Sequence, residues 1–265
     1  AYVQFCNDNF IALATGSDLR DFVFEKGFYN RLLRRAYRKS RHLFYFNPDH
    51  VEAIQKLRLQ RADYSPYPIE TEKFFQYRQK SSGQLHSVFW PSTWSFRLKG
   101  ADKFIAACQN LFRQSRFFQL KITDFTKNPE VTDVEKKFVL DFAAQYPQQV
   151  NIIPRIENKE EFMKECSRHE LIIDQFSLGS YGAIAVEAAA AGKAVMTYLN
   201  PAYLHFFDGQ APAFINVHTT EEIMNELANF HWNEDRANQA IAWAAKWHKA
   251  EEVVLKMLKT ANYAV

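Results

Sequence analysis

The chain has 265 residues, 47% of them hydrophobic and 24% charged, which is globular composition with room for one large domain or two smaller ones. Its net charge of +3 is too small to indicate nucleic-acid binding by itself. The cysteines Cys6, Cys108 and Cys166 have neither disulfide nor zinc-site spacing, and no apolar run approaches the roughly 18 residues of a spanning helix. A reduced, cytoplasmic setting is the simplest interpretation.

Strand and helix patterns alternate through the first part of the chain. Strands are predicted at residues 9–15 and 42–46, and helices at 27–40 and 47–57. The first strand stops at Gly16, and the second helix has Asn47 as a plausible N-cap with Pro48 at its first position. The polar stretch 76–86 has no periodicity. We therefore place a domain boundary there.

The second part repeats the alternation. Strands are predicted at 87–92, 117–125, 150–154, 170–176, 193–199 and 213–217. Helices are predicted at 100–115, 133–146, 158–169 and 180–192, from Thr220, and as an amphipathic last helix at 247–258. Strands that alternate with helices predict parallel sheets covered on both faces. We expect an α/β protein with a partial first domain at 1–76, a second domain at 77–250 and a last helix at 251–265.

One strand end has the composition of a phosphate site. "LIID" ends a predicted strand at Asp174, "SLGSYG" follows, and a helix begins at once. Glycines let a ligand approach the backbone, and the free N–H groups of a helix start favour an anion. Glu187 lies in the first turns of that helix, where it could accept hydrogen bonds from a ribose diol. The same residues fit a structural βαβ unit whose glutamate faces solvent, and both interpretations stay open.

This segment resembles the nucleotide-sugar motif of the retaining GT-B glycosyltransferases, which carry an E-x7-E element. Ser180, Tyr181 and Gly182 stand for its Gly-Phe-Gly, and Glu187 matches its second glutamate. Gly179 occupies the position of the first glutamate, which in the family contacts the donor sugar. The "DQF" before the loop is shared with some branches of the superfamily, which places Asp174 and Gln175 among the donor-binding residues that the resemblance implies.

Two more strand ends carry weaker resemblances. In "TWSFRLKG", Lys99 matches the family's Lys-Gly, whose cation neutralises the donor diphosphate. Thr93 stands where the family has arginine, and Arg97 is a candidate substitute. In "TGSD", residues Gly16, Ser17 and Asp18 resemble a His-Gly-x-Asp corner near the donor and acceptor, with threonine in place of histidine. The alternatives are solvated loop cations in the first case and a helix N-cap by Ser17 or Asp18 in the second.

The resemblance implies a GT-B fold of two Rossmann-like domains with parallel sheets, the N-terminal one apparently truncated. It implies a retaining glycosyltransferase with Lys99, Glu187 and Asp18 in catalytic roles, no cofactor and no metal. The donor is a nucleotide-sugar, the acceptor a glycan or lipid-linked molecule as in cell-surface polysaccharide biosynthesis, and nucleic acid is not a partner. A non-catalytic nucleotide-sugar-binding or partner subunit of the same fold is the alternative.

The opening "AYVQFC" reads as the middle of a strand, so we expect the natural N-terminus to be missing. The resemblance suggests that the last helix packs at the interdomain junction. Arg31, Arg34, Arg35 and Arg38 form a broad basic face, with Phe28, Leu32 and Ala36 expected opposite. That face could bring the enzyme into peripheral contact with an anionic membrane, although a solvated basic face is the commoner use of such a pattern.

Overall fold

The computed structural model describes residues 10–80 and 83–262, so the strand predicted for the opening residues and Cys6 lie outside the described residues. The chain divides into two compact units. The first unit consists of Ala1–Ile69, Ala202–Gly209 and Trp247–Val265, and the second of Glu70–Pro201 and Gln210–Lys246. The first unit thus ends before the predicted boundary, and it includes the last helix.

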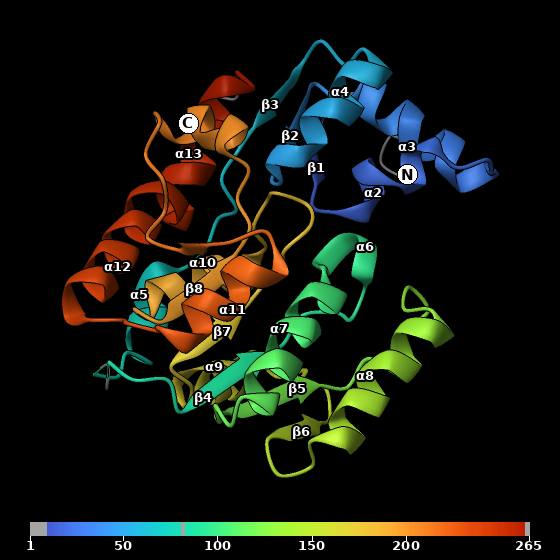
Figure 1. The fold of residues 1–265 in the computed structure, drawn as a ribbon. Coiled ribbons are helices and arrows are strands. Elements are labelled where there is room, and N and C mark those ends of the chain that lie inside the picture. Colours follow the sequence, from blue (N-terminus) through green and yellow to red (C-terminus); the bar gives the residue numbers. More distant parts are fainter. Residues whose placement is uncertain (1–9, 81–82, 263–265) are drawn as a thin grey trace. The chain divides into compact units, whose positions relative to one another are not determined.

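The first unit contains a parallel sheet in the order β1-β2-β3 (Figure 1). Its strands are β1 (Ile11–Ala14), β2 (His42–Tyr45) and β3 (Ala62–Tyr64). Side chains of β2 alternate between two buried clusters, because successive residues of a strand point to opposite faces. Leu43 and Tyr45 belong to one cluster, whereas Phe44 packs with Val253 and Met257. The sheet is therefore covered on both faces, on one of them by the last helix.

Helices and short 3-10 turns accompany these strands. They are α2 (Ser17–Arg20), α3 (Phe28–Lys39), α4 (Val51–Leu57) and α13 (Ala250–Thr260), with 3-10 turns η1 (Phe22–Phe24), η2 (Pro48–His50) and η3 (Pro201–Phe207). The predicted helix at 47–57 begins as a 3-10 turn. Pro48 does occupy its first position, but the side chain of Asn47 caps nothing and donates instead to the carbonyl of Thr15 at 2.8 Å. Asn47 is thus the N-cap residue by position, as predicted, but its side chain does not cap because a neighbouring strand end takes that amide.

Two other predictions for the first unit need correction. Leu33 and Tyr37 form the core face of α3, whereas Phe28 is 64% exposed. Phe28 lies on the stripe of the exposed arginines rather than opposite them. The predicted last helix at 247–258 is interrupted at Lys249, whose backbone is extended. There the N–H of Ile69 bonds the carbonyl of His248 at 2.8 Å and the N–H of Ala250 bonds the carbonyl of Ile69 at 2.9 Å, a tertiary pairing that periodicity does not reveal.

The second unit contains a six-stranded parallel sheet in the order β6-β5-β4-β7-β8-β9 (Figure 1). Its strands are β4 (Ser87–Trp90), β5 (Gln119–Thr123), β6 (Val150–Ile153), β7 (Leu171–Ile173), β8 (Ala194–Thr197) and β9 (Ile215–Asn216). The chain adds β5 and β6 on one side of β4 and then returns to add β7 on the other. This reversal of strand order lies between β4 and β7, and open α/β sheets bind ligands beyond the carboxyl ends of the strands at such a point.

The helices of this sheet follow the predicted order. They are α5 (Thr71–Phe75), α6 (Phe96–Lys99), α7 (Ala101–Arg113), α8 (Asp133–Gln145), α9 (Lys159–Ser167), α10 (Ala183–Ala190), α11 (Thr220–Ala228) and α12 (Glu234–His248), the last of which ends in the first unit. Reciprocal capping boxes start α8 and α11. The sequence did not predict α5 or α6, which are too short to show periodicity, nor α12, of which only Trp247 and His248 fall in the helix predicted at 247–258. Among the described residues, no helix has both the length and the apolar character needed to cross a membrane.

Candidate donor site at the carboxyl edge of the second sheet

The loop between β7 and α10 is built around glycine. Gly179 has φ +69°, and a Cβ added there would lie 2.8 Å from the Cβ of Asn200. The N–H of Asn200 donates to the carbonyl of Gly179 at 2.9 Å, which holds the loop against the end of β8. Because left-handed backbone and this close approach both favour glycine, the position taken by glutamate in the resembled motif has no space for a side chain here.

Gln175 holds the rest of this loop from inside. Its amide nitrogen donates to the carbonyls of Ser180 and Tyr198, and its amide oxygen accepts from the N–H groups of Ser177 (2.9 Å) and Leu178 (2.8 Å). A side chain so engaged shapes the loop rather than offering hydrogen bonds to a ligand. Gln175 was predicted to bind the donor, and the structure places it beneath the loop.

Ser180 and Tyr181 are also buried. The ring of Tyr181 meets Phe214 and Trp243 edge to face, with centroids 5.6 and 5.5 Å away. Of these two predicted donor-binding residues, the structure therefore directs the tyrosine side chain into the core. At the start of α10, these two residues therefore offer a ligand their backbone and not their side chains.

Asp174 connects the two loops that flank the reversal of strand order. Its side chain is 1% exposed and accepts from Lys99 Nζ at 3.0 Å and from the N–H of Gly182 at 2.7 Å. Lys99 ends α6, which begins at the N-cap Ser95, and it is partly exposed. The carboxylate thus draws an ammonium group to the first turn of α10, where the helix dipole already favours an anion.

Glu187 is buried in the second turn of α10, with 5% of its surface exposed, so it does not face solvent. Its carboxylate forms an ion pair with Lys159, the first residue of α9. Burial raises the pKa of Glu187 above its ordinary value, and the hydrogen bond and charge of Lys159 partly offset that rise. The Lys159 ammonium lies 5.1 Å from the ring centre of Phe162 and 5.7 Å from that of Phe74.

A cavity of about 350 Å³ lies at the carboxyl ends of β4, β5 and β6. Its lining consists of Pro91, Ser92, Thr93, Lys99, Thr123, Phe125, Arg155, Ile156, Glu157, Lys159, Phe162 and Ile184. Three cations and one acid therefore share the cavity with aromatic and aliphatic side chains, and the acid, Glu157, bonds Arg155 at 3.1 Å. Within the described residues, the hydroxyls of Ser92 and Thr123 are buried and have no hydrogen-bond partner. The cavity can hold a ligand that combines phosphate, hydroxyl groups and a flat apolar ring.

The two residues considered in place of the family's arginine differ in their position relative to the cavity. Thr93 lines the cavity, and its hydroxyl lies 3.4 Å from the Asn128 side-chain nitrogen. Arg97 is exposed and is not part of the lining; its charge acts on Glu135. Burial would raise the pKa of Glu135, but hydrogen bonds from the backbone of Phe96 and from Thr132, together with Arg97, bring it below its ordinary value.

In the first unit, the predicted site residue Asp18 also takes its hydrogen bonds from within the fold. Asp18 accepts from the N–H of Gly16 at 2.7 Å, from the N–H of Thr15 at 3.4 Å and from the hydroxyl of Tyr37 at 2.7 Å. Gly16 is the N-cap residue of α2, and Ser17 is its first helical residue, so neither Ser17 nor Asp18 is the N-cap. Asp18 nonetheless satisfies two backbone donors at the start of this helix.

The sequence did not single out Lys159 or Arg155. Both follow β6, in "PRIENKEEF", and the rule that ligands lie beyond the carboxyl ends of parallel strands points to this segment as well. Asn158 caps α9 and so sets the direction of Lys159. In the described part of the chain, no group of three or more His, Cys, Asp or Glu side chains is arranged to hold a metal ion.

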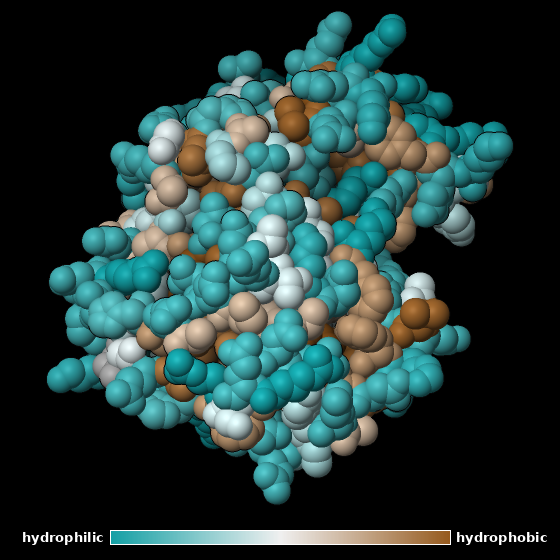
Figure 2. Space-filling view, viewed as in Figure 1, coloured by the Kyte–Doolittle hydropathy of each residue, from teal (hydrophilic) through white to brown (hydrophobic). Residues whose placement is uncertain are grey.

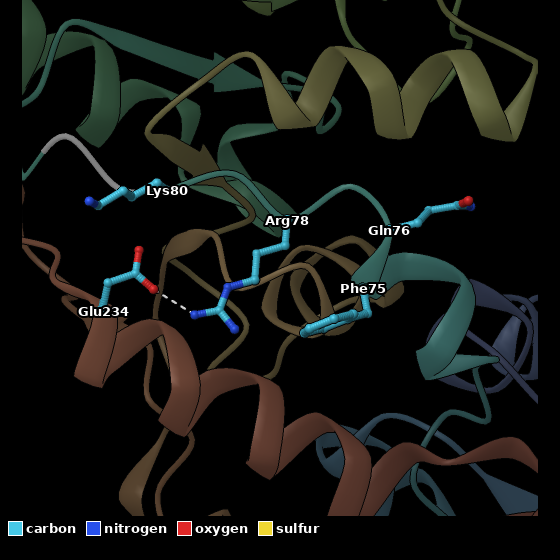
Figure 3. A pocket seen from close by; sticks show the side chains of 5 residues that line it. All are labelled: Phe75, Gln76, Arg78, Lys80 and Glu234. Atoms are coloured by element: carbon cyan, nitrogen blue, oxygen red, sulfur yellow. Dashed lines mark hydrogen bonds and ion pairs between the residues drawn. The ribbon is translucent and has the colours of Figure 1, made fainter.

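A second, more open hollow is lined by Phe75, Gln76, Arg78, Lys80 and Glu234 (Figure 3). Figure 3 shows Arg78 and Glu234 pointing toward one another while Gln76 points away. The Arg78 guanidinium bonds Glu234 at 2.5 Å and Asn238 at 2.8 Å. This arginine therefore attaches the segment after α5 to α12, and we assign the hollow a structural role.

No model of a known protein family matches the chain, and no curated protein matches it by sequence. Solved structures do match its fold. HepE of Anabaena, in complex with UDP and glucose, is 12% identical with a TM-score of 0.67, over 94% of this chain and 70% of HepE. Sucrose-phosphate synthase of Thermosynechococcus elongatus is 12% identical with a TM-score of 0.64, over 94% of this chain and 66% of the synthase.

TarM is 10% identical with a TM-score of 0.66, over 98% of this chain and 57% of TarM. This chain thus spans just under two thirds of the synthase and little more than half of TarM. At such low identity the likeness concerns the fold. Together with the two parallel sheets it confirms the expected architecture, and the chain has the GT-B fold of these glycosyltransferases.

Proposed function

We propose that the chain binds a nucleotide-sugar and transfers its sugar to a glycan or lipid-linked acceptor. The observation that carries the proposal is the cavity at the carboxyl ends of β4, β5 and β6, which is lined by Lys99, Arg155 and Lys159 and by Ile184 of the first turn of α10. The neighbouring folds add support, since HepE was solved with UDP and glucose and TarM with UDP and a GlcNAc-glycerol. Retention of configuration, a role in cell-surface polysaccharide synthesis and a cytoplasmic location are parts of this proposal that rest on the sequence resemblance.

In the proposed reaction, Lys99 and the start of α10 hold the diphosphate, and no metal ion is needed for that charge. The bond between the sugar and the diphosphate breaks while a bond to the acceptor hydroxyl forms, and the acceptor proton goes to the leaving phosphate. A fixed cation at the leaving group lowers the barrier because negative charge develops there. Glu187 accepts hydrogen bonds from the ribose hydroxyls, which replace its ion pair with the half-exposed Lys159.

The first experiment is nucleotide binding to the full chain. UDP, GDP and ADP are titrated while the melting temperature is measured, for the wild type and for Glu187→Gln and Lys99→Met. Free ligand at about 100 times the dissociation constant stabilises a protein by roughly 2.7 kcal/mol. We expect one nucleotide to do so, and we expect each variant to bind it about 10- to 100-fold more weakly, as for the loss of hydrogen bonds to a charged group.

Glu165→Gln is the matched control, because Glu165 is another buried glutamate of the second unit but bonds Lys121, Arg168 and His169. This variant should melt earlier and keep its nucleotide response. A flat response of the folded wild type to every nucleotide contradicts the proposal.

The second candidate, a non-catalytic nucleotide-sugar-binding subunit, is favoured by one observation. Gly179 leaves no space for the sugar-contacting glutamate of the resembled motif. Release of free nucleotide from the matching nucleotide-sugar separates the two candidates. Turnover that depends on Lys99 supports the transferase, and tight binding without turnover supports the subunit.

A further inference from the structure

Four large aromatic side chains are exposed within eight residues of the first unit. Phe22 and Phe24 of η1 are each 44% exposed, and Phe28 and Tyr29 at the start of α3 are 64% and 80% exposed. Val23 between the first two is fully buried, so the turn is anchored in the core while both phenylalanines face outward. In Figure 2, tan atoms lie among teal ones over the α2–α3 end of this unit. Exposed apolar side chains that lie close together, unlike single scattered ones, mark a contact site.

The turn is fastened to the helix, so these aromatic side chains form one surface. The Asn30 side chain donates to the carbonyl of Phe22 at 2.8 Å, and Arg34 Nη1 donates to the carbonyl of Val23 at 2.5 Å. The rings of Phe28 and Tyr29 meet edge to face with centroids 5.8 Å apart. Because Leu33 and Tyr37 of α3 pack into the core, the opposite face of this helix is directed toward solvent.

That other face is basic. Phe28, Arg31, Arg35 and Arg38 are spaced by three, four and three residues, which puts them on one side of the helix, and all four are exposed. Residues 20–41 carry eight Lys or Arg and two acids, a net +6, although the whole chain carries only +3. Of the two acids, Glu25 accepts a hydrogen bond from Asn30 and Asp21 is half-buried. Arg20 pairs with Asp49 and Arg34 bonds the carbonyl of Val23, so it is Arg31, Arg35 and Arg38 that place positive charge on the face that also exposes Phe28.

We propose that this aromatic–basic surface, formed by Phe22, Phe24, Phe28, Tyr29, Arg31, Arg35 and Arg38, binds an anionic membrane surface. Amphipathic aromatic rings are stable at the depth of lipid headgroups, and arginines beside them meet the lipid phosphates. A bilayer accepts several rings without specific pockets for them, and the outward rings lie on a rigid turn and helix start. All of these residues belong to the first unit, so the inference does not depend on the nucleotide site.

The test is co-sedimentation of the full chain with vesicles of phosphatidylcholine alone and of equal parts phosphatidylcholine and phosphatidylglycerol. We expect binding to the anionic vesicles, weakening as salt screens the charges. Arg31→Gln/Arg38→Gln should lower the partition coefficient about 25-fold, since each cation near the surface contributes roughly a factor of five. Phe28→Ser/Tyr29→Ser should weaken binding to the same vesicles with little change in salt dependence.

The second unit offers matched controls. Phe117 is 62% exposed, and Arg113 and Arg116 are exposed near it. Phe117→Ser and Arg113→Gln/Arg116→Gln should leave vesicle binding unchanged, and all variants should keep the wild-type melting temperature because these side chains lie at the surface. Equal losses in both sets overturn the proposal, as does an absence of vesicle binding at low salt. Binding to single-stranded RNA that depends on the same residues, without vesicle binding, also overturns it.

Discussion

At the ends of β1 and β7, a glycine and a carboxylate lie where a parallel strand gives way to the helix that follows it. After β1, Asp18 turns back onto the N–H groups of Thr15 and Gly16 and takes its third hydrogen bond from the Tyr37 hydroxyl. After β7, Asp174 caps Gly182 and takes its other bond from the Lys99 ammonium. The first carboxylate completes the local fold, whereas the second also places a cation at a helix start beside a cavity.

Replacing Asp174 or Asp18 with alanine should reveal the largest difference in stability between the ends of β7 and β1. Asp174→Ala leaves the N–H of Gly182 and the Lys99 ammonium without their buried acceptor, so we expect it to lower the free energy of unfolding by about 3 kcal/mol. Asp18→Ala acts at a partly exposed four-residue helix and should cost about 1 kcal/mol. Urea denaturation of both variants measures the difference, and equal losses would contradict it. Asp174→Asn, which can still accept from Gly182, is the intermediate control.

The two glycines provide the next comparison. Gly179→Ala puts a Cβ into left-handed backbone and within 2.8 Å of Asn200, and we expect a loss of about 2 kcal/mol. Gly16 has extended backbone, and an added Cβ would meet nothing within 4 Å, so Gly16→Ala should change stability by less than about 0.5 kcal/mol. Thermal melting of the two single variants decides this. If Gly179→Ala leaves the melting temperature unchanged, the loop between β7 and α10 can rearrange to accept the Cβ, which contradicts the expected loss.

Tyr37→Phe removes the hydroxyl group that donates a hydrogen bond to Asp18 after β1. Burial, followed by the charge and hydrogen bond of Asp18, raises the pKa of Tyr37 above its ordinary value. A raised folded pKa gives stability that is present below the unfolded pKa of about 10 and is lost as the pH rises above it. Tyr37→Phe should cost about 1 kcal/mol at neutral pH and reduce that alkaline loss. Denaturation at several pH values measures both, and an unchanged alkaline slope would contradict the raised pKa of Tyr37.

Glu187→Gln should also have a small effect on stability, although the carboxylate is buried. Burial raises the pKa of Glu187, so the folded state binds its proton more tightly than the unfolded state, and this carboxyl opposes folding increasingly as the pH rises above its ordinary pKa. The isosteric amide should therefore change the neutral-pH unfolding free energy by less than about 1 kcal/mol. A larger loss in urea denaturation would mean that the ion pair with Lys159 holds the fold together.

Much of the architecture was readable in the chain. Apolar strands alternating with helices predicted the parallel sheets, and the order of elements from residue 87 to 228 matches the observed one, apart from the short α6 and the 3-10 segment η3. The prediction also placed Thr93 and Lys99 after the end of β4 and Glu187 in the first turns of a helix, where the structure has them. It did not detect α5 and α6, because helices of five and four residues show no periodicity. It also did not foresee the interruption of the last helix at Lys249, because that depends on pairing with Ile69.

By itself, the sequence determined the class of fold and the approximate positions where strands end and helices begin, because patterns of apolar and turn residues are local features of the chain. The tertiary structure decided which polar side chains remain available to a ligand. Gln175, Tyr181 and Asp18 have the residue types of a binding site, yet their partners lie within the fold. Lys159 looks like an ordinary helix-start lysine and comes to lie beside Glu187. Such pairings join residues far apart in sequence, so they depend on packing rather than on any local pattern.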